Sequence, residues 1–328
     1  MSATAIAIPA AENVDEAYAF CRSIAHRYGA NFSVGFRFLP RVKRRAVYAA
    51  YAFCRWADDI ADETVILSEA KDPLAMCEGG PSPSSVAGDL AMCEGGPSPS
   101  SGLRMTKLDE WQSELDRCYA GKPSHPITVA LADALQHFAI PHAAFVALID
   151  GCRQDMAKTR YESFDELLHY CDLVASSISD ISLAIYGYRT DAALAYGRSL
   201  STALQLTNVT RDVGDDLGRD RVYLPQEELR RFGVEERELF ERTESDRMRH
   251  LIEFQIARAE DYFRDAEPLL RELSADARFP TLLMGGIYAT VLAHLRRDPL
   301  VVLQRRISLT TREKVLVVAR RVFRPHFV

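Results

Sequence analysis

Apolar residues recur along this chain three or four positions apart, which is the spacing of one face of an α-helix. The clearest runs follow Asn13, open at Pro40 with RVKRRAVYAAYAFCRWADDIADE, and extend over about 244–273. Alternation with a period of two is confined to short pieces such as RVYLP. The pattern predicts an all-α protein.

Residues that favour helix starts stand before several of these runs. Asn13 can cap the first helix, and Ser163 and Glu166 have the spacing of a capping box before FDELLHYCDLVASS. Thr190 can cap the run that ends QLTNVTRDVGDD, and Pro225 stands where a first-turn proline would open QEELRRFG. We therefore expect helices to begin at these points.

One segment interrupts the helical pattern. The sequence LAMCEGGPSPSS occurs twice, at residues 74–85 and 90–101. Gly, Pro and Ser dominate it, a composition typical of flexible loops. Two short copies are too few for a solenoid. We predict one domain over residues 1–328, with a flexible Gly/Pro/Ser-rich insertion at residues 67–105.

Composition and charge limit the classes of function. The 328 residues are 48% hydrophobic, which is enough for a large core. The net charge of −6 argues against nucleic acid as a partner. From residue 296 onward, however, nine Lys and Arg face two acidic residues. That segment is either a solvated helix face or a surface for phosphates or anionic lipid headgroups.

The cysteines and the ends of the chain bear on location. Seven cysteines without a CxxC pair suggest neither a zinc site nor a disulfide framework. The N-terminal residues lack a basic region and a long apolar run, and no 18-residue apolar segment appears. We expect a cytoplasmic protein whose contact with a membrane would be peripheral, at the inner surface.

Candidate chemistry lies in two acidic clusters, each at the end of a long apolar helix. At 3.6 residues per turn, the members of each cluster share one helix face. The first cluster consists of Arg55, Asp58, Asp59 and Asp62. The second consists of Gln205, Asn208, Asp212, Asp215 and Asp216, with Arg211 beside it.

Carboxylates gathered in this way suit hard divalent cations. Mg²⁺ prefers oxygen ligands and commonly bridges a few carboxylates to a substrate phosphate. Arginines next to the clusters suit phosphate oxygens. Two such clusters facing each other across a helical bundle could hold magnesium ions and, on them, a diphosphate.

Two other interpretations of the acidic residues need weighing. Glu166 and His169 form a Glu-x-x-His pair, which also occurs in di-iron bundles. Those bundles need two such pairs, and no other histidine here has Glu three residues before it. A protein that only stores or senses a metal is the non-enzymatic alternative, and it would bind metal without releasing diphosphate.

The two clusters lie in segments that resemble a known family. YAAYAFCRWADDIADE and LQLTNVTRDVGDDLGRDRVYLP together resemble the squalene/phytoene synthases, the head-to-head prenyl synthases. The resemblance spans about residues 17–316 except for the repeat. It implies an isoprenoid-synthase helical bundle with a central cavity, two allylic prenyl diphosphates as substrates, and Mg²⁺, or alternatively Mn²⁺, as the cofactor.

The resemblance also implies roles for individual residues. Tyr170 matches a tyrosine proposed to act in proton transfer, together with the ionising site at Asp58, Asp62, Asp212 and Asp216. The implied metal ligands are Asp58, Asp59, Asp62, Asp212, Asp215 and Asp216. The implied substrate-binding residues are Arg55, Tyr51, Phe32, Phe36, Asp155, Gln205, Asn208, Arg211, Tyr223, Arg306 and Lys314.

The resemblance leaves the product open. Where the family usually has VAGTVG this chain has VASSIS, so Ser176 and Ser179 replace glycines and change the expected cavity shape. The segments ANFSVGFRFLP and RQDMAKTRY look nearest to the bacterial hopanoid branch, which favours farnesyl diphosphate and a C30 product. The alternatives are phytoene from geranylgeranyl diphosphate and hydroxysqualene from presqualene diphosphate. NADPH is expected only if the product is squalene.

Overall fold

The computed structural model describes residues 13–28, 35–62, 99–323 and 326–327. In this part of the chain extended segments pair only at two isolated bridges, Arg160 with Val222 and Tyr188 with Leu273. The all-α prediction is confirmed. The helices are α1 (Val14–Tyr28), α3 (Arg41–Ala61), α4 (Pro99–Tyr119), α5 (Pro126–Leu135), α6 (His142–Ala157), α7 (Phe164–Cys171), the π-helix η1 (Asp172–Ser176), α8 (Ser177–Tyr186), α9 (Ala192–Arg211), α10 (Val213–Leu217), α11 (Gln226–Phe232), α12 (Glu236–Phe240), α13 (Asp246–Ala266), α14 (Leu269–Glu272), α15 (Ala275–Arg297), α16 (Val301–Gln304) and α17 (Thr311–Phe323).

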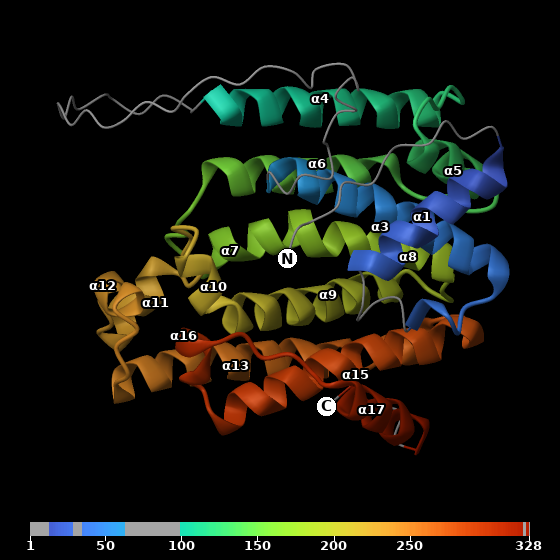
Figure 1. Cartoon of the computed structure of the whole chain (residues 1–328). Coiled ribbons are helices and arrows are strands. Elements are labelled where there is room, and N and C mark those ends of the chain that lie inside the picture. The colour runs from blue at the N-terminus through green and yellow to red at the C-terminus, as the bar shows by residue number, and fades with distance from the viewer. Residues whose placement is uncertain (1–12, 29–34, 63–98, 324–325, 328) are drawn as a thin grey trace, which may run out of the picture.

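The long helices stack in layers around α9 (Figure 1). α4 forms the upper edge in this view, and α17 lies at the lower edge beneath α15. α9 packs against α13, α15, α7, α8 and η1, so it is the centre of the bundle. The short helices α10, α11 and α12 gather at the left end, where α9 ends. The second acidic cluster therefore lies at one end of the central helix.

A glycine allows α8 and α9 to approach each other closely. A Cβ on Gly197 of α9 would lie 2.6 Å from the Ser179 hydroxyl oxygen and 2.7 Å from Leu183 Cδ1, both on α8. Ser179 is one of the two serines that replace the family's usual glycines. Its side chain therefore lies in the α8–α9 contact, where the missing side chain of Gly197 leaves room for it.

α3 carries the first acidic cluster and is held by small and aromatic side chains. Its buried alanines let α1, α5 and α6 pack closely against it. The Phe53 ring stacks on Trp111 of α4 at 4.7 Å and meets the edge of Phe145 of α6 at 4.8 Å. Burial of aromatic rings contributes strongly to core stability, so the helix that presents the cluster is firmly seated.

Two predicted helix caps are present. The Asn13 side chain accepts a hydrogen bond from the Glu16 backbone N–H at 2.9 Å. Ser163 accepts one from the Glu166 N–H at 3.3 Å. The reciprocal bond of a capping box is displaced, because the Glu166 carboxylate accepts the N–H of Glu162 instead.

Two other predicted starts are wrong by one residue. Asp191, not Thr190, is the N-cap of α9, and the Thr190 hydroxyl donates to the Glu272 carboxylate at 2.8 Å. Pro225 is the N-cap of α11 and not its first residue. The start of α9 goes with the tertiary contact of Thr190, and the start of α11 goes with the extended backbone of Pro225. Local sequence shows neither feature.

The predicted insertion lies largely outside the described residues. Residues 63–98, which include the first copy of the repeat, are outside the described residues. α4 begins at Pro99, inside the range 67–105 that we expected for the insertion. The helical part of that range thus starts earlier than the composition suggested.

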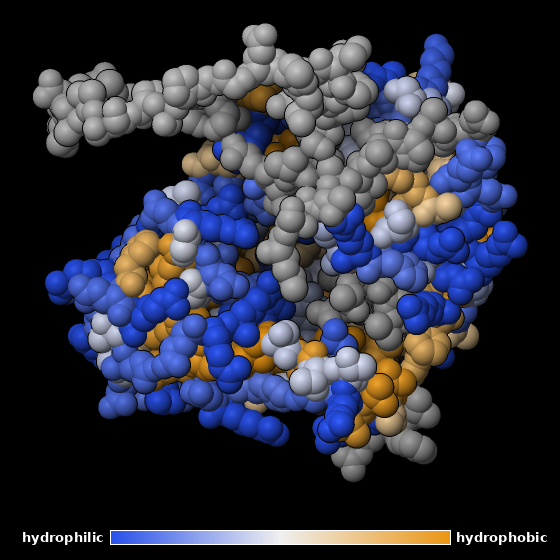
Figure 2. Space-filling view, viewed as in Figure 1, coloured by the Kyte–Doolittle hydropathy of each residue, from blue (hydrophilic) through white to orange (hydrophobic). Residues whose placement is uncertain are grey.

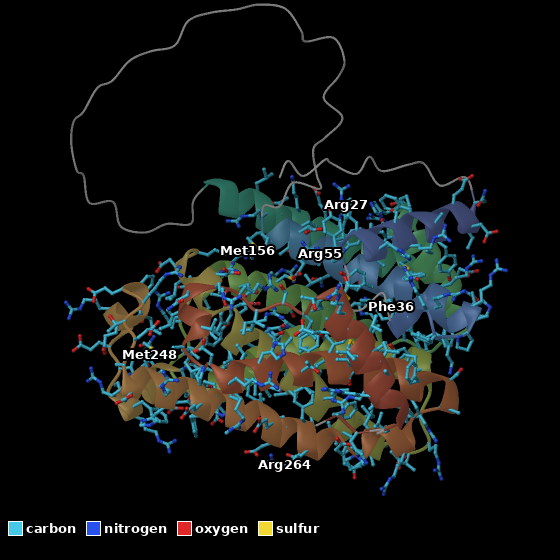
Figure 3. All side chains as sticks on the ribbon, turned by 60° about the horizontal axis from the view of Figure 1, so that its bottom comes forward. Arg27, Phe36, Arg55, Met156, Met248 and Arg264 are labelled. Carbon is cyan, nitrogen blue, oxygen red and sulfur yellow. The ribbon has the colours of Figure 1, made fainter. Side chains whose placement is uncertain are left out.

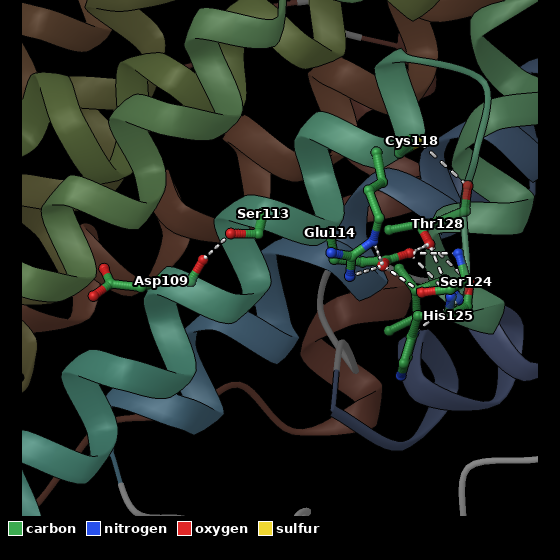
Figure 4. A network of polar contacts seen from close by, with 9 residues as sticks. Asp109, Ser113, Glu114, Cys118, Ser124, His125 and Thr128 are labelled. Carbon is green, nitrogen blue, oxygen red and sulfur yellow. Dashed lines mark hydrogen bonds and ion pairs between the residues drawn. The ribbon is translucent and has the colours of Figure 1, made fainter.

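A buried carboxylate fixes the turn between α4 and α5 (Figure 4). Glu114 accepts hydrogen bonds from the Ser124 N–H at 2.7 Å, the Ser124 hydroxyl at 2.6 Å and the His125 N–H at 3.0 Å. The Thr128 hydroxyl and the Arg117 guanidinium also donate to it. Burial opposes the charge, but these donors prevail and lower the pKa of Glu114 to about 2.

The same turn supports α3. The His125 ring lies 5.0 Å from Trp56 of α3 and 5.1 Å from Trp111 of α4. Its Nδ1 accepts the Ile127 N–H at 3.2 Å, and burial lowers the pKa of His125 to about 4. The imidazole is therefore neutral near pH 7. Because Trp56 precedes Asp58 by two residues, the Glu114 network supports the helix end that carries the first cluster.

The face of the molecule in Figure 2 is mostly polar, with several apolar areas among the polar residues. Hydrophobic residues gather at the lower right of this view, where α17 lies in Figure 1. The side chains of Val315 and Leu316 on that helix are 62% and 54% exposed. No described helix combines the length and apolar character that crossing a bilayer requires.

Candidate active site

The first cluster lies on the last turns of α3. The Arg55 guanidinium pairs with the Asp59 carboxylate, which is buried, and lies 3.7 Å from the Asp58 carboxylate. It also lies over the Tyr28 ring at 5.1 Å. Figure 3 labels Arg55 on the ribbon of this part of the bundle. The positive charge of Arg55 thus offsets the negative charges of Asp58 and Asp59, two of the three predicted aspartates.

Asp58 occupies an unusual environment. Its side chain is 57% accessible, yet removal of water by the surrounding protein raises the pKa of Asp58 to about 7. Arg55 opposes this rise in pKa, and the like charge of Asp62 adds to it. The carboxylate thus stays accessible to water although many protein atoms surround it. Such a carboxylate favours a cation.

The second cluster begins where α9 ends. Asp212 breaks the helical backbone between α9 and α10, so the single helix that we expected over this segment is two. The Arg211 guanidinium donates to both Asp212 oxygens, at 2.7 and 2.5 Å. Arg306 approaches the same carboxylate at 2.9 Å. Two arginines therefore share Asp212.

The remaining members of this cluster differ in exposure. Asp216 is half-buried and makes no close ion pair with a described residue. Its burial, together with the like charge of Asp212, raises the pKa of Asp216 to about 7. Asn208 donates to the Gln205 side-chain oxygen at 3.3 Å, and its own buried Oδ1 has no hydrogen-bond partner among the described residues. Asp215 is exposed.

Gly214 explains how the chain turns at this point. A Cβ on Gly214 would lie 2.7 Å from the Val302 carbonyl oxygen and 3.1 Å from that of Leu303, both on α16. Arg242 donates to the Gly214 carbonyl at 3.2 Å and also to that of Leu303. α10 can pack on the backbone of α16 only because residue 214 lacks a side chain. This contact brings Arg306, just after α16, to Asp212.

Two arginines that the sequence did not single out connect the halves. Arg219 and Arg221, which follow α10, lie 3.9 and 3.8 Å from the carboxylate oxygens of Asp62, the C-cap of α3. The charges of the same two arginines also act on Asp216, so they lie between the end of the first cluster and the second cluster. Both arginines stand inside the quoted segment LQLTNVTRDVGDDLGRDRVYLP, so the motif could have indicated them.

Asp155 joins two predicted tyrosines. The Tyr170 hydroxyl donates to one oxygen of the Asp155 carboxylate at 2.7 Å, and the Tyr223 hydroxyl donates to the other at 2.8 Å. Arg221 donates to the backbone carbonyl of Asp155 at 3.0 Å. Residues from α6, α7 and the segment after α10 thus meet beside the acidic clusters. A small cavity next to them is bounded by Asp216, Arg221 and Tyr223 among others.

The other predicted residues are placed as follows. Phe36, which Figure 3 labels, is buried. Its ring meets the ring of Tyr51 edge-on at 6.2 Å. Lys314 is half-buried on α17, and no ion pair joins it to a carboxylate in the described part of the chain. Phe32 lies outside the described residues. Tyr288 of α15, which no sequence pattern singles out, is buried beside Arg211.

The donor set fits divalent cations. Asp58 and Asp216 have raised pKa values; the Arg55 guanidinium is 3.7 Å from Asp58, and Asp216 makes no ion pair with a described residue. One buried oxygen each of Asp59 and Asn208 has no hydrogen-bond partner among the described residues. Oxygen ligands of this kind suit Mg²⁺. No group of three His, Cys, Asp or Glu side chains converges as a ready-made metal site in the described ranges. A cation here would thus take further ligands from water or a substrate phosphate.

The fold and the site define a class: an all-α bundle with two arginine-flanked acidic clusters. Comparison with known proteins gives its family. Residues 25–313 match the squalene/phytoene synthase family model, and the chain belongs to that family. Its members are prenyltransferases that join prenyl diphosphates head to head.

Similar proteins include enzymes of several products. The 15-cis-phytoene synthase of Synechocystis sp. is 33% identical over 93% of this chain and 84% of its own. The phytoene synthase of Mycobacterium tuberculosis is 35% identical over 93% and 90%. Among solved structures, a ligand-bound dehydrosqualene synthase has a TM-score of 0.77 at 25% identity, over 94% of this chain and 95% of its own. Squalene synthase HpnC from Alicyclobacillus acidocaldarius has a TM-score of 0.71 at 27% identity, over 87% of this chain and 95% of its own.

Proposed function

We propose that this chain performs the family's condensation at the two clusters, with Mg²⁺ as the divalent metal. The observation that carries the proposal is the approach of Arg219 and Arg221 to Asp62, which brings the segment after α10 against the end of α3. The diphosphate of one substrate would lie between the two clusters. This arrangement places acidic groups for metal and basic groups for phosphate on both sides of one site.

The residues that would hold the metal are Asp58, Asp62 and Asp216, with Asn208 contributing its unpartnered oxygen. Bound Mg²⁺ supplies positive charge that stabilises the departing diphosphate. Asp59, Asp212 and Asp215 complete the expected acidic set. Asp58 and Asp216 are suited to the role because burial disfavours their charge until a cation arrives.

The arginines would change partners when substrate binds. Arg55 pairs with Asp59, and Arg211 and Arg306 pair with Asp212. A metal–diphosphate complex offers cations to the carboxylates and phosphate oxygens to the guanidinium groups. The ion pairs therefore keep the site neutral before binding. Lys314, on the neighbouring α17, would add positive charge to the same anion.

The reaction consists of two ionisations. Loss of diphosphate from the first substrate leaves an allylic cation, and the double bond of the second substrate attacks it. Loss of a proton closes a cyclopropane ring that still carries a diphosphate, and a second ionisation and rearrangement give the linear product. Cations of this kind react with water, so the site must exclude it. The aromatic rings of Phe36, Tyr51 and Tyr223 provide part of that lining.

Farnesyl diphosphate is the first candidate substrate, with a C30 squalene-type product. The segments ANFSVGFRFLP and RQDMAKTRY support it, as does the structural similarity to a dehydrosqualene synthase and to squalene synthase HpnC. It would place the chain in triterpenoid or hopanoid synthesis. NADPH would be needed only for squalene itself, and water capture would give hydroxysqualene.

Geranylgeranyl diphosphate is the second candidate, with phytoene as the product. The observation that favours it is the identity of 33% and 35% to phytoene synthases over 93% of this chain, which exceeds the identity to the two solved structures. Both candidates use the same diphosphate site. They differ in the length of the prenyl chain that the apolar interior must bury, at roughly 0.8 kcal/mol for each methylene.

Product analysis with each diphosphate distinguishes these candidates. The chain is incubated with Mg²⁺ and either C15 or C20 diphosphate, with and without NADPH, and the extract is analysed by mass spectrometry. A C30 hydrocarbon or alcohol from the C15 substrate supports the first candidate, and phytoene from the C20 substrate supports the second. Absence of a coupled product from both substrates would contradict the proposed function.

A peripheral membrane contact through α17 also belongs to the proposal. The exposed Val315 and Leu316 lie on a helix that carries the exposed Arg312 and Arg320. Apolar side chains bordered by basic ones suit the surface of an anionic bilayer. Because prenyl substrates and products are lipids, such a contact would shorten their path to the site.

A further inference from the structure

The Asp155 carboxylate differs from three other enclosed carboxylates in the described part of the chain. Asp59, Asp212 and Glu228 each pair with an arginine guanidinium. The Asp155 carboxylate pairs with none in the described residues, and both of its oxygens accept hydrogen bonds from neutral tyrosine hydroxyls. Burial raises the pKa of Asp155, although the two hydroxyls and Arg221 oppose the rise.

The hydrogen bonds fix the direction of two protons. Because Tyr170 and Tyr223 both donate to Asp155, their hydroxyl hydrogens point at this carboxylate. The lone pairs of each phenol oxygen then point elsewhere. The Tyr161 ring lies 5.5 Å from Tyr170 and 5.6 Å from Tyr223, and this packing restricts both rings. A tyrosine held in this way can accept a proton but cannot donate one to a substrate.

A phenol oxygen accepts a proton only if it passes its own proton on. Tyr170 has an acceptor for that proton in Asp155 at 2.7 Å. We propose that Asp155 is the positioning residue of a relay that removes the proton lost when the cyclopropane ring closes. This inference rests on the proposed function and specifies where its proton goes.

The step balances as follows. A C–H bond of the coupled cation breaks, and its electron pair forms the last C–C bond of the cyclopropane ring. The proton moves to the Tyr170 oxygen, while the hydroxyl proton of Tyr170 moves to the Asp155 carboxylate. Tyr170 ends as a neutral phenol and Asp155 as a neutral carboxylic acid. Tyr223 retains its proton and holds the second oxygen of Asp155 in place.

A structural role for Asp155 is the competing explanation. The segment after α10 is fastened near this residue by Arg221 and by the backbone bond from Val222 to Thr159 at 2.9 Å. Arg160 fastens the same segment through Asp220 at 2.7 Å and does not touch Asp155. Arg160→Gln therefore loosens the segment and leaves the proposed relay intact. Tyr161→Phe removes a hydroxyl from the ring cluster without removing a hydrogen bond to Asp155.

The test compares two products of the ionised substrate. Diphosphate release reports ionisation, and the ratio of coupled product to prenyl alcohol reports whether the cation is quenched productively. For Asp155→Asn we expect the ratio of coupled product to prenyl alcohol to fall at least about tenfold below that of wild type, in keeping with the size of general acid–base effects. Tyr170→Phe should lower the ratio similarly, and Asp155→Glu should restore part of it.

Each outcome has a distinct meaning. An unchanged ratio in Asp155→Asn, or an equal fall of the ratio in Arg160→Gln, would overturn the relay. If Asp155→Asn fails to fold by thermal melting, Tyr170→Phe against Tyr161→Phe decides, since only the former should lower the ratio. If wild type itself forms no coupled product, the proposed function fails and the relay fails with it.

Discussion

Replacing Glu114 with Gln tests how far a buried charge network seats the helix of the first cluster. The carboxylate accepts from the Ser124 N–H, the Ser124 hydroxyl and the His125 N–H, and from Thr128 and Arg117. A glutamine keeps one oxygen but turns an NH₂ group toward these donors. Leaving buried donors without an acceptor costs about 1–3 kcal/mol each.

We therefore expect Glu114→Gln to lose about 3 kcal/mol of unfolding free energy if one or two donors are stranded. For a chain of this length that corresponds to a fall in Tm of roughly 5 °C, since the entropy of unfolding grows with size. Glu110→Gln is the matched control. It makes the same change one helical turn earlier, at an exposed position.

The effect should depend on pH in one direction. The hydrogen bonds lower the folded-state pKa of Glu114 from 4.5 to about 2, so its stabilisation is complete above the ordinary pKa and is lost as the pH falls toward 2. Urea unfolding at pH 7 and at pH 3.5 should show a smaller difference between wild type and Glu114→Gln at the lower pH. Equal losses in the two variants, or a difference that grows as the pH falls, would refute the reasoning.

Three further predictions concern the site and the surface. Asp212→Asn should abolish turnover and also destabilise the fold by about 3 kcal/mol, because the 7%-exposed Arg211 guanidinium loses the negative charge it pairs with. A turnover assay and urea unfolding would measure the two effects. Deletion of residues 74–98 should leave turnover within about threefold of wild type, and loss of all activity would contradict a dispensable insertion. Replacing Val315 and Leu316 with Ser should reduce sedimentation with anionic vesicles several-fold while turnover of detergent-dispersed substrate persists; unchanged sedimentation would exclude α17 as the contact.

The sequence predicted the helices and the two clusters because each depends on local order. Helical spacing placed Asp58 and Asp62 on one face of α3, and the start of α1 followed from Asn13. A resemblance was still needed to bring Asp155 and Tyr223 into one site, since 68 residues separate them. Periodicity carries no information about such a contact.

Other features depended on tertiary contacts that no local pattern encodes. The helix break at Asp212 goes with the packing of Gly214 on the backbone of α16. The shift of the α9 cap from Thr190 to Asp191 accompanies the contact with Glu272. Arg219 joins the site only because the segment after α10 returns to the end of α3.

The central claim is that the two clusters act together on one diphosphate. The most direct measurement is Mg²⁺-dependent formation of coupled product by wild type, Asp58→Asn and Asp216→Asn, with whichever of the C15 and C20 diphosphates wild type accepts. Neither aspartate makes a short ion pair with a described residue, so both variants should fold, which thermal melting verifies. We predict that each variant loses at least about a hundredfold in rate, equivalent to about 2.7 kcal/mol of transition-state stabilisation. Near-normal product formation by either folded variant would contradict the account.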